Sequence, residues 1–359
     1  MLRIIRNALL LKNLFLLHLQ PMKIAERLTP GDFLRFRSVC TAWASAITVG
    51  GYSPLRNFIP WLMLSDNPYS FFSIPDSLSY HYPSDVRCIE CISAQNGWLA
   101  IVHGVSKYCL INPITRSQIN LPPVSRNFHV RKIVLSSTPS ANISSSCIIV
   151  AMYGVLYYSL AFSRAGSTSW TSIRLTHGME KGIEDVVYHD GNFFVISTRG
   201  QVQALDLSGH CPMVLSFVNN YAEVEVEQRG YLWTRYLVSS FGDLLLVRKQ
   251  RDYVRNRRFI IMKFNPMIDS CWEEITDLGT RSLFLDNKNL TSISASEITG
   301  HKGNCIYFIN EHMDFHDNYV CDVEIFDIES GTIQPCFRPE LQFICSLQLP
   351  PIWFMPSLS

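Results

Sequence analysis

The sequence predicts a mainly β chain, a β-propeller of about six blades preceded by a short α-helical module. From residue 58 onward, short apolar runs alternate with clusters of Gly, Asn, Asp, Ser and Pro, which is the pattern of strands joined by turns. No long amphipathic helix interrupts this pattern. A β-sandwich of that size would be unusual, whereas a radial repeat of small sheets accommodates it.

The composition excludes several classes of protein. The 359 residues include 31 Lys and Arg against 30 Asp and Glu, a net charge of +1, so no nucleic-acid or membrane partner is expected. With 47% hydrophobic and 17% charged residues the chain is not disordered. The 11 cysteines lack framework spacing, which favours a reducing compartment. We therefore expect the cytoplasm and/or the nucleus.

The first 21 residues form a divergent apolar N-terminal segment. Arg3 and Arg6 precede an apolar run that contains no acidic residue, a pattern shared with targeting peptides, so a mitochondrial location is the alternative. Polar residues such as Asn13 and His18 interrupt the run. It therefore lacks the continuous apolar stretch that a helix needs to cross a bilayer. We expect an apolar helix that packs on its neighbour.

A helical module is predicted over residues 22–50. Thr29 to Asp32 separates two helical segments, and Asp32 can cap the second. Apolar residues then recur at steps of three and four and share one face. Some thirty residues are too few for a stable core of their own, so this face must pack on the following domain or on another protein.

The module resembles the second half of an F-box. The matching residues, in order, are Ile24, Arg27-Leu28, Asp32-Phe33-Leu34-Arg35 and Arg37-Ser38-Val39-Cys40-Thr41-Ala42-Trp43. The usual Leu-Pro opening is absent, and Pro21 falls where the first helix would continue. F-boxes bind the small adaptor subunit of cullin–RING ubiquitin ligases. The resemblance implies that the adaptor is bound by Ile24, Leu28, Phe33, Leu34, Phe36, Val39, Cys40 and Trp43; the alternative is a helical cap on the next domain.

A recurring unit is visible in the domain predicted for residues 58–349. An apolar strand led by Gly is followed by a strand that ends in Asn-Pro or Asp, and then by a polar-aromatic strand. The glycine suits the first turn, and the Asn or Asp closes the next turn through its side chain. The leading glycines are Gly97, Gly191, Gly242 and Gly303. The first unit is short, so we expect residues 341–349 to supply its missing strand, leaving 350–359 as a tail.

Residues 22–359 as a whole resemble plant F-box proteins with a KIB-type β-propeller. The residues that carry the resemblance are Arg37 to Trp43, Gly97-Trp98-Leu99, Asn112-Pro113, Leu121-Pro122 and Leu349 to Ser357. The resemblance implies a substrate receptor, in which the helical module docks on the ligase adaptor and the propeller presents a target protein. It implies no catalytic residues.

Motifs for catalysis or metal binding are weak. Cys88 and Cys91 form a single Cys-x-x-Cys pair, which the strand pattern places on opposite faces as structural thiols. His312 and His316 stand near Asp314 and Asp317, more typical of a polar loop than of a metal site. We expect no metal, no cofactor and no enzymatic activity.

The stretch from Arg248 to Arg258 contains six basic residues and is predicted to be a hairpin tip. A basic stretch of this kind usually forms a solvated loop. The alternative is a nuclear-import signal or a contact with an acidic partner.

Three functions remain open: a ligase substrate receptor, a propeller interaction protein whose F-box has decayed, and an enzyme that uses the central channel. The last needs convergent His, Asp or Glu residues at the inner strand ends, and the sequence shows no such set.

Overall fold

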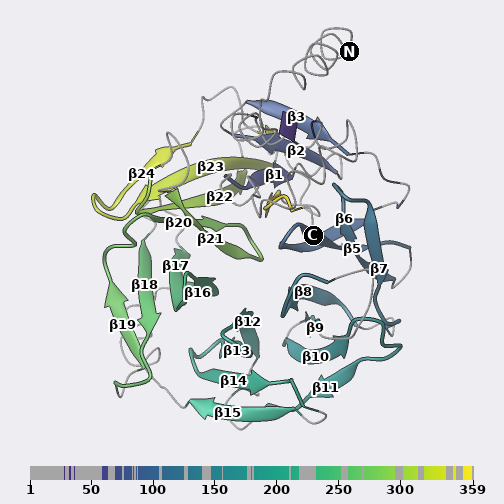
Figure 1. Cartoon of the computed structure of the whole chain (residues 1–359). Coiled ribbons are helices and arrows are strands. Elements are labelled where there is room, and N and C mark those ends of the chain that lie inside the picture. Colours follow the sequence, from purple (N-terminus) through teal and green to yellow (C-terminus); the bar gives the residue numbers. More distant parts are fainter. Residues whose placement is uncertain are drawn as a thin grey trace, which may run out of the picture.

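The computed structural model describes residues 59–357 with internal gaps, the longest at residues 218–231. Before residue 59 it describes only Leu28, Asp32, Phe33 and Phe36. Over these residues the chain forms six sheets arranged around a central axis, a six-bladed β-propeller (Figure 1). The predicted fold class is confirmed, whereas most of the predicted helical module lies outside the described residues.

The first three blades are four-stranded, and their strands follow in order from the axis outward. Blade 1 comprises β26 (Ile352–Phe354), β1 (Trp61–Met63), β2 (Ser70–Ser73) and β3 (Leu78–His81). Blade 2 comprises β4 (Glu90–Gln95), β5 (Trp98–Val102), β6 (Tyr108–Asn112) and β7 (Ser117–Asn120). Blade 3 comprises β8 (Val130–Leu135), β9 (Ile148–Tyr153), β10 (Ser159–Arg164) and β11 (Thr171–Ile173).

Blades 4 and 5 follow the same order, and blade 6 is larger. Blade 4 comprises β12 (Ile183–His189), β13 (Asn192–Ser197), β14 (Val202–Asp206) and β15 (Met213–Phe217). Blade 5 comprises β16 (Leu232–Ser240), β17 (Asp243–Arg251), β18 (Phe259–Phe264) and β19 (Trp272–Ile275). Blade 6 comprises β21 (Leu290–Ser294), β20 (Arg281–Leu285), β22 (Cys305–Met313), β23 (Tyr319–Asp327) and β24 (Thr332–Pro335), and β25 (Phe343–Ile344) pairs with β23.

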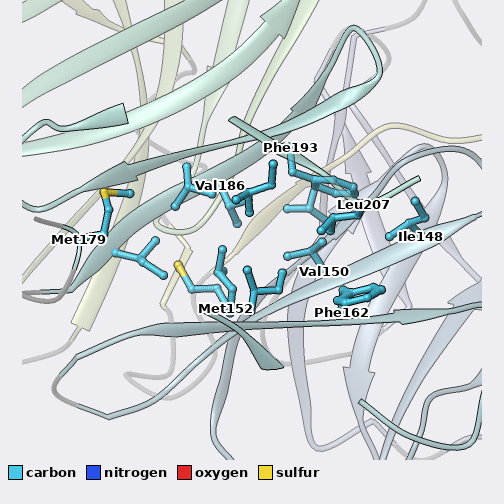
Figure 2. Close-up of a cluster of buried hydrophobic side chains, with 14 residues drawn as sticks. Ile148, Val150, Met152, Phe162, Met179, Val186, Phe193 and Leu207 are labelled. Carbon is cyan, nitrogen blue, oxygen red and sulfur yellow. The ribbon is translucent and has the colours of Figure 1, made fainter. Parts of the chain in front are cut away.

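The core lies between neighbouring blades. Figure 2 shows the cluster between blades 3 and 4, where Val150 and Phe162 of one sheet face Val186 and Phe193 of the next. Comparable clusters fill the other interfaces between described strands. Both faces of a sheet are therefore covered, which explains why the inner strands read as nearly continuous apolar runs.

The turn chemistry of the predicted unit is confirmed. Two-residue turns join β4 to β5, β12 to β13 and β16 to β17, with Gly97, Gly191 and Gly242 as their second residues, all at positive φ. The Asn112 side-chain oxygen accepts hydrogen bonds from the backbone of Ile114 and Thr115, and it thereby closes the turn after β6.

Two features differ from the sequence prediction. The strand that closes blade 1 is Ile352–Phe354 rather than a strand within residues 341–349; it pairs antiparallel with β1, so the expected tail belongs to the propeller. In blade 6 the strand after Gly303 follows an inserted hairpin, β20–β21, and pairs with β20 in parallel.

Candidate functional site

Of the eight residues expected to bind the adaptor, the structure describes three. Leu28 is half-buried, whereas Phe33 and Phe36 lie in helical geometry and are 0% and 6% exposed. These two rings therefore pack inside the chain, and their contact with an adaptor stays a prediction. Ile24, Leu34, Val39, Cys40 and Trp43 lie outside the described residues.

The second candidate region is the central channel, a cavity of about 380 Å³. Its wall is formed by the inner strands β4, β8, β12, β16 and β21, together with Met355, the residue that follows the closing strand β26. Most apolar side chains of these strands pack between blades, so backbone and polar side chains face the axis. What the channel can do depends on whether those polar groups are available.

Polar side chains of β4 bind the backbone of β8, the next inner strand. Ser93 Oγ donates to the Ile133 carbonyl (3.1 Å) and accepts from the Ile133 N–H (3.3 Å). The Gln95 amide makes the same pair of bonds with the backbone of Leu135, at 3.2 and 2.9 Å. These bonds fix the register of blade 2 against blade 3.

A buried ion pair joins blades 3 and 4. The Lys132 ammonium donates to Asp185 Oδ1 at 2.6 Å, and both side chains are less than a tenth exposed. Asp185 also accepts from the N–H groups of Val186 and of Leu237, the latter in blade 5. One carboxylate therefore links three consecutive blades.

A second ion pair joins β12 of blade 4 to β16 of blade 5. Arg235 Nη1 donates to Glu184 Oε2 at 2.9 Å and to the Thr198 carbonyl at 2.9 Å. Glu184 is the extra residue of a β-bulge in β12, and similar register shifts occur in β4 and β8. Each bulge changes the direction of the side chain that follows it. The side chains affected are those of Ser93, Lys132 and Asp185.

The two ends of the channel differ. At the end where β4, β8, β12 and β16 begin, which we call the entry face, the turn between β20 and β21 reaches over the opening. Arg131 of blade 3 donates to the carbonyl of Asn287 (3.2 Å), and Lys288 donates to Glu90 Oε1 of blade 2 (2.9 Å). At the opposite end, which we call the hairpin face, lie the two-residue turns between the first and second strands of blades 2, 4 and 5.

In the described part of the chain, Lys132 is the charged side chain that lines the channel, and it is used as a bond between blades. No group of three or more His, Cys, Asp or Glu side chains among the described residues could hold a metal ion. The loop that contains Asp314, His316 and Asp317 lies outside the described residues. The arrangement supports a rigid scaffold that presents its two faces.

The basic stretch is only partly a hairpin tip. β17 continues to Arg251, so Arg248 and Lys249 belong to the strand. Arg248 is buried over the Trp233 ring, and Lys249 lies over the Phe308 ring, at 4.9 and 5.1 Å from the ring centroids. Among the described residues, Arg258 is exposed at this end of the hairpin.

The Cys-x-x-Cys pair is structural. Cys88 precedes β4 and packs against the cluster that contains Cys91, so the two thiols are not separated by the sheet as expected. Burial raises the pKa of the Cys88 thiol to about 12 and the pKa of Cys91 well above its usual value, so neither forms a reactive thiolate. Among the other described cysteines, Cys321 is disulfide-bonded.

Comparison with known proteins assigns the propeller to a family. The KIB1-4 beta-propeller family matches residues 71–327. The chain belongs to the KIB1-4 β-propeller family. The resemblance found in the sequence is thereby confirmed.

None of the helices among the described residues is long and apolar enough to cross a membrane.

Relatives of this KIB1-4 propeller carry F-box names. F-box protein At2g05970 from Arabidopsis thaliana is 24% identical over 369 residues, covering 94% of each chain. Two more A. thaliana proteins with F-box names, At4g22660 and At4g22165, are 24% and 26% identical, again over 94% of each chain. The chain is thus similar to plant F-box proteins over nearly its whole length.

Solved structures match only weakly. The six-bladed fungal lectin of Aleuria aurantia covers 75% of this chain and 91% of its own at 10% identity, with a TM-score of 0.34. At this score the likeness says nothing about function.

Proposed function

We propose that this protein is the substrate-recognition subunit of a cullin–RING ubiquitin ligase. Residues 22–50 bind the small adaptor subunit, and the propeller binds a target protein. The observation that carries the proposal is the co-occurrence of the F-box residues Arg37 to Trp43 with a KIB1-4 propeller in one chain, which aligns along 94% of its length with proteins named as F-box proteins. The channel supports this role because its polar groups are used to stiffen a scaffold.

The test measures binding of the purified adaptor subunit to the full chain by calorimetry. Trp43→Ala should weaken binding by about 2–4 kcal/mol, because truncating a buried aromatic anchor removes a large part of an interface's energy. The propeller's melting temperature should not change. Thr41→Ala is the matched control, since Thr41 lies on another face of the predicted helix and should leave the affinity unaltered. If Trp43→Ala lowers affinity and melting temperature together, the module is a cap of the propeller.

A second candidate is a propeller interaction protein without a ligase link. Two observations favour it: the F-box opening is absent around Pro21, and Phe33 and Phe36 are buried within the chain. Failure of the wild-type chain to bind the adaptor at all would select it.

We further propose that the protein acts in the cytoplasm or nucleus and has no catalytic activity of its own. The reporter test is a fusion of residues 1–30 to a fluorescent protein. A diffuse signal agrees with the proposal, whereas a mitochondrial signal with a shortened product contradicts it.

A further inference from the structure

The hairpin face carries an aromatic side chain that the fold itself does not require. The three two-residue turns on this face are Asn96-Gly97, Asp190-Gly191 and Phe241-Gly242. In each turn both residues have positive φ; the first residues have φ values of 51°, 43° and 50°. Blades 2, 4 and 5 thus use one backbone conformation at equivalent places.

Only one of the three turns has an unfavourable residue. Asn and Asp tolerate the left-handed conformation, and Asn-Gly and Asp-Gly are the preferred sequences of this turn. A phenylalanine is disfavoured there because its bulky side chain gains nothing from the backbone nearby. Phe241 is 64% exposed, so burial does not compensate for the strain. Its position is explained if the ring is buried by another molecule.

The neighbouring turn of blade 5 adds two more exposed apolar side chains. Met267 is 90% exposed and Ile268 is 37% exposed. They lie between β18 and β19, and the turn is fixed because the Asn265 side chain accepts a hydrogen bond from the Met267 N–H (3.1 Å). The backbone that carries Met267 and Ile268 is thus fixed before binding, so ordering this backbone adds little entropic cost.

A charged cluster lies on the same edge of the propeller. Asp243, which follows the Phe241 turn, accepts from Lys263 of β18 and from Arg281 of blade 6, each at 2.7 Å. Two cations share one carboxylate, so the cluster has a net charge of +1. The Lys263 side chain is 43% exposed and can reach a further acidic group.

We propose that the hairpin face of blade 5 is the surface that binds the target protein, with Phe241 as its anchor. The patch comprises Phe241, Met267, Ile268, Lys263 and Arg281. The partner presents an apolar pocket for the Phe241 ring, rimmed by carboxylates that meet Lys263 and Arg281. The proposal rests on the receptor role above and adds to it the face and the chemistry of recognition.

The experiment begins with photo-crosslinking in cells that express the full chain. The crosslinker p-benzoylphenylalanine is placed at position 241 in one variant and at position 157 in another. Tyr157 is a suitable comparison because it is also exposed (68%) but lies in the connection between β9 and β10, on the entry face. A protein that crosslinks at 241 is identified by mass spectrometry and purified for binding measurements. A lack of any adduct at 241 overturns the proposal.

The decisive variant is Phe241→Asn, which recreates the Asn-Gly turn of blade 2. It should keep or raise the melting temperature, because it relieves the turn, while it weakens binding of the purified partner roughly 30-fold. Lys263→Ala should weaken binding about threefold, and added salt should weaken it further. Tyr157→Ser should leave the affinity unchanged.

Undiminished binding by Phe241→Asn, or a partner whose affinity rises with salt, overturns the proposal. If Tyr157→Ser alone abolishes binding, the target docks on the entry face, and the receptor role survives without this assignment. Adaptor binding, measured in parallel, reports on the receptor role separately, since Phe241→Asn leaves residues 22–50 intact.

Discussion

Single residues in the repeat hold the closing segment of the propeller in place. Gly97 has a φ of +82°, and a Cβ added to it would lie 2.3 Å from Ser357 Cβ. The Asn112 amide donates to the Ser357 carbonyl at 3.0 Å. The glycine and the asparagine that mark the repeat in the sequence are therefore also the residues against which the chain end packs.

Gly97→Ala should destabilise the protein by roughly 2–4 kcal/mol, because it combines left-handed strain with a clash against Ser357. Gly191→Ala is the matched control: its φ is +84°, but nothing lies within 4 Å of the added Cβ, so strain alone predicts about 1–2 kcal/mol. Urea unfolding of the two variants measures the difference. Equal losses would show that the chain end moves aside without a penalty.

Asp286 is a buried carboxylate that joins blade 6 to the closing strand. It accepts from the N–H groups of Lys288, Asn289 and Trp353. Burial raises its pKa above the usual value although these hydrogen bonds oppose the shift. The folded state therefore holds this proton more tightly than the unfolded state does.

A raised pKa predicts that Asp286 favours the folded state at low pH and that this contribution is lost as pH rises through the folded pKa. Between that pKa and the ordinary value of 3.8, the free energy of unfolding of wild type minus that of Asp286→Asn should increase as the pH falls. Denaturant titrations of both proteins from pH 8 to pH 4 measure it. A difference that is flat, or that shrinks on acidification, contradicts a raised pKa for this carboxyl group.

At the scale of elements, bulged inner strands turn polar side chains toward the next blade. The Lys132–Asp185 pair is the most buried of these links. Removal of one partner leaves the other charge buried without compensation, so Lys132→Met should cost roughly 3–5 kcal/mol. Asp185→Leu should cost more, since the N–H groups of Val186 and Leu237 also lose their acceptor. Thermal unfolding ranks the two; the reverse order would mean that the backbone bonds contribute little.

The sequence predicts those elements whose signals are local. Apolar runs bounded by Gly or Asn-Pro define most strands, and the turn residues define their hairpins, because each depends on only a few neighbouring residues. Lys132 and Asp185 stand out as charges inside apolar runs, yet their pairing depends on β-bulges in separate strands, which a sequence does not show. Arg248 lies in a strand rather than at the predicted hairpin tip because the length of β17 depends on pairing with β16.

The closing strand differs from its prediction for a similar reason. β26 has only three residues and directly follows Pro350-Pro351, which normally mark the end of structure rather than its continuation. Its position is set by long-range pairing with β1 and by Asp286. Likewise, the hairpin β20–β21 occupies the inner position of blade 6, an insertion before the Gly303 strand that the spacing of the repeat does not reveal.

At the scale of the whole molecule, the ring is closed by three residues. Ile352, Trp353 and Phe354 are 1%, 2% and 0% exposed. The Trp353 ring packs edge-on against Phe284 of blade 6 and donates to the Leu285 carbonyl, while Phe354 packs against Phe71 of blade 1. One short strand therefore contacts both ends of the ring of blades.

Deletion of residues 350–359 should abolish cooperative folding. Burial of three large apolar side chains contributes roughly 5–9 kcal/mol, which is comparable with the total stability of a domain. The deletion also exposes the edge of β1 and should promote aggregation. Trp353→Phe is the milder control, since it keeps an aromatic ring and loses the hydrogen bond to Leu285 and part of the buried indole, so it should melt cooperatively at a lower temperature. A synthetic peptide of residues 350–359 added to the truncated chain should restore a cooperative transition, because the edge of β1 remains available to pair. A truncated chain that melts cooperatively at the wild-type temperature without the peptide would show that the ring does not depend on this strand.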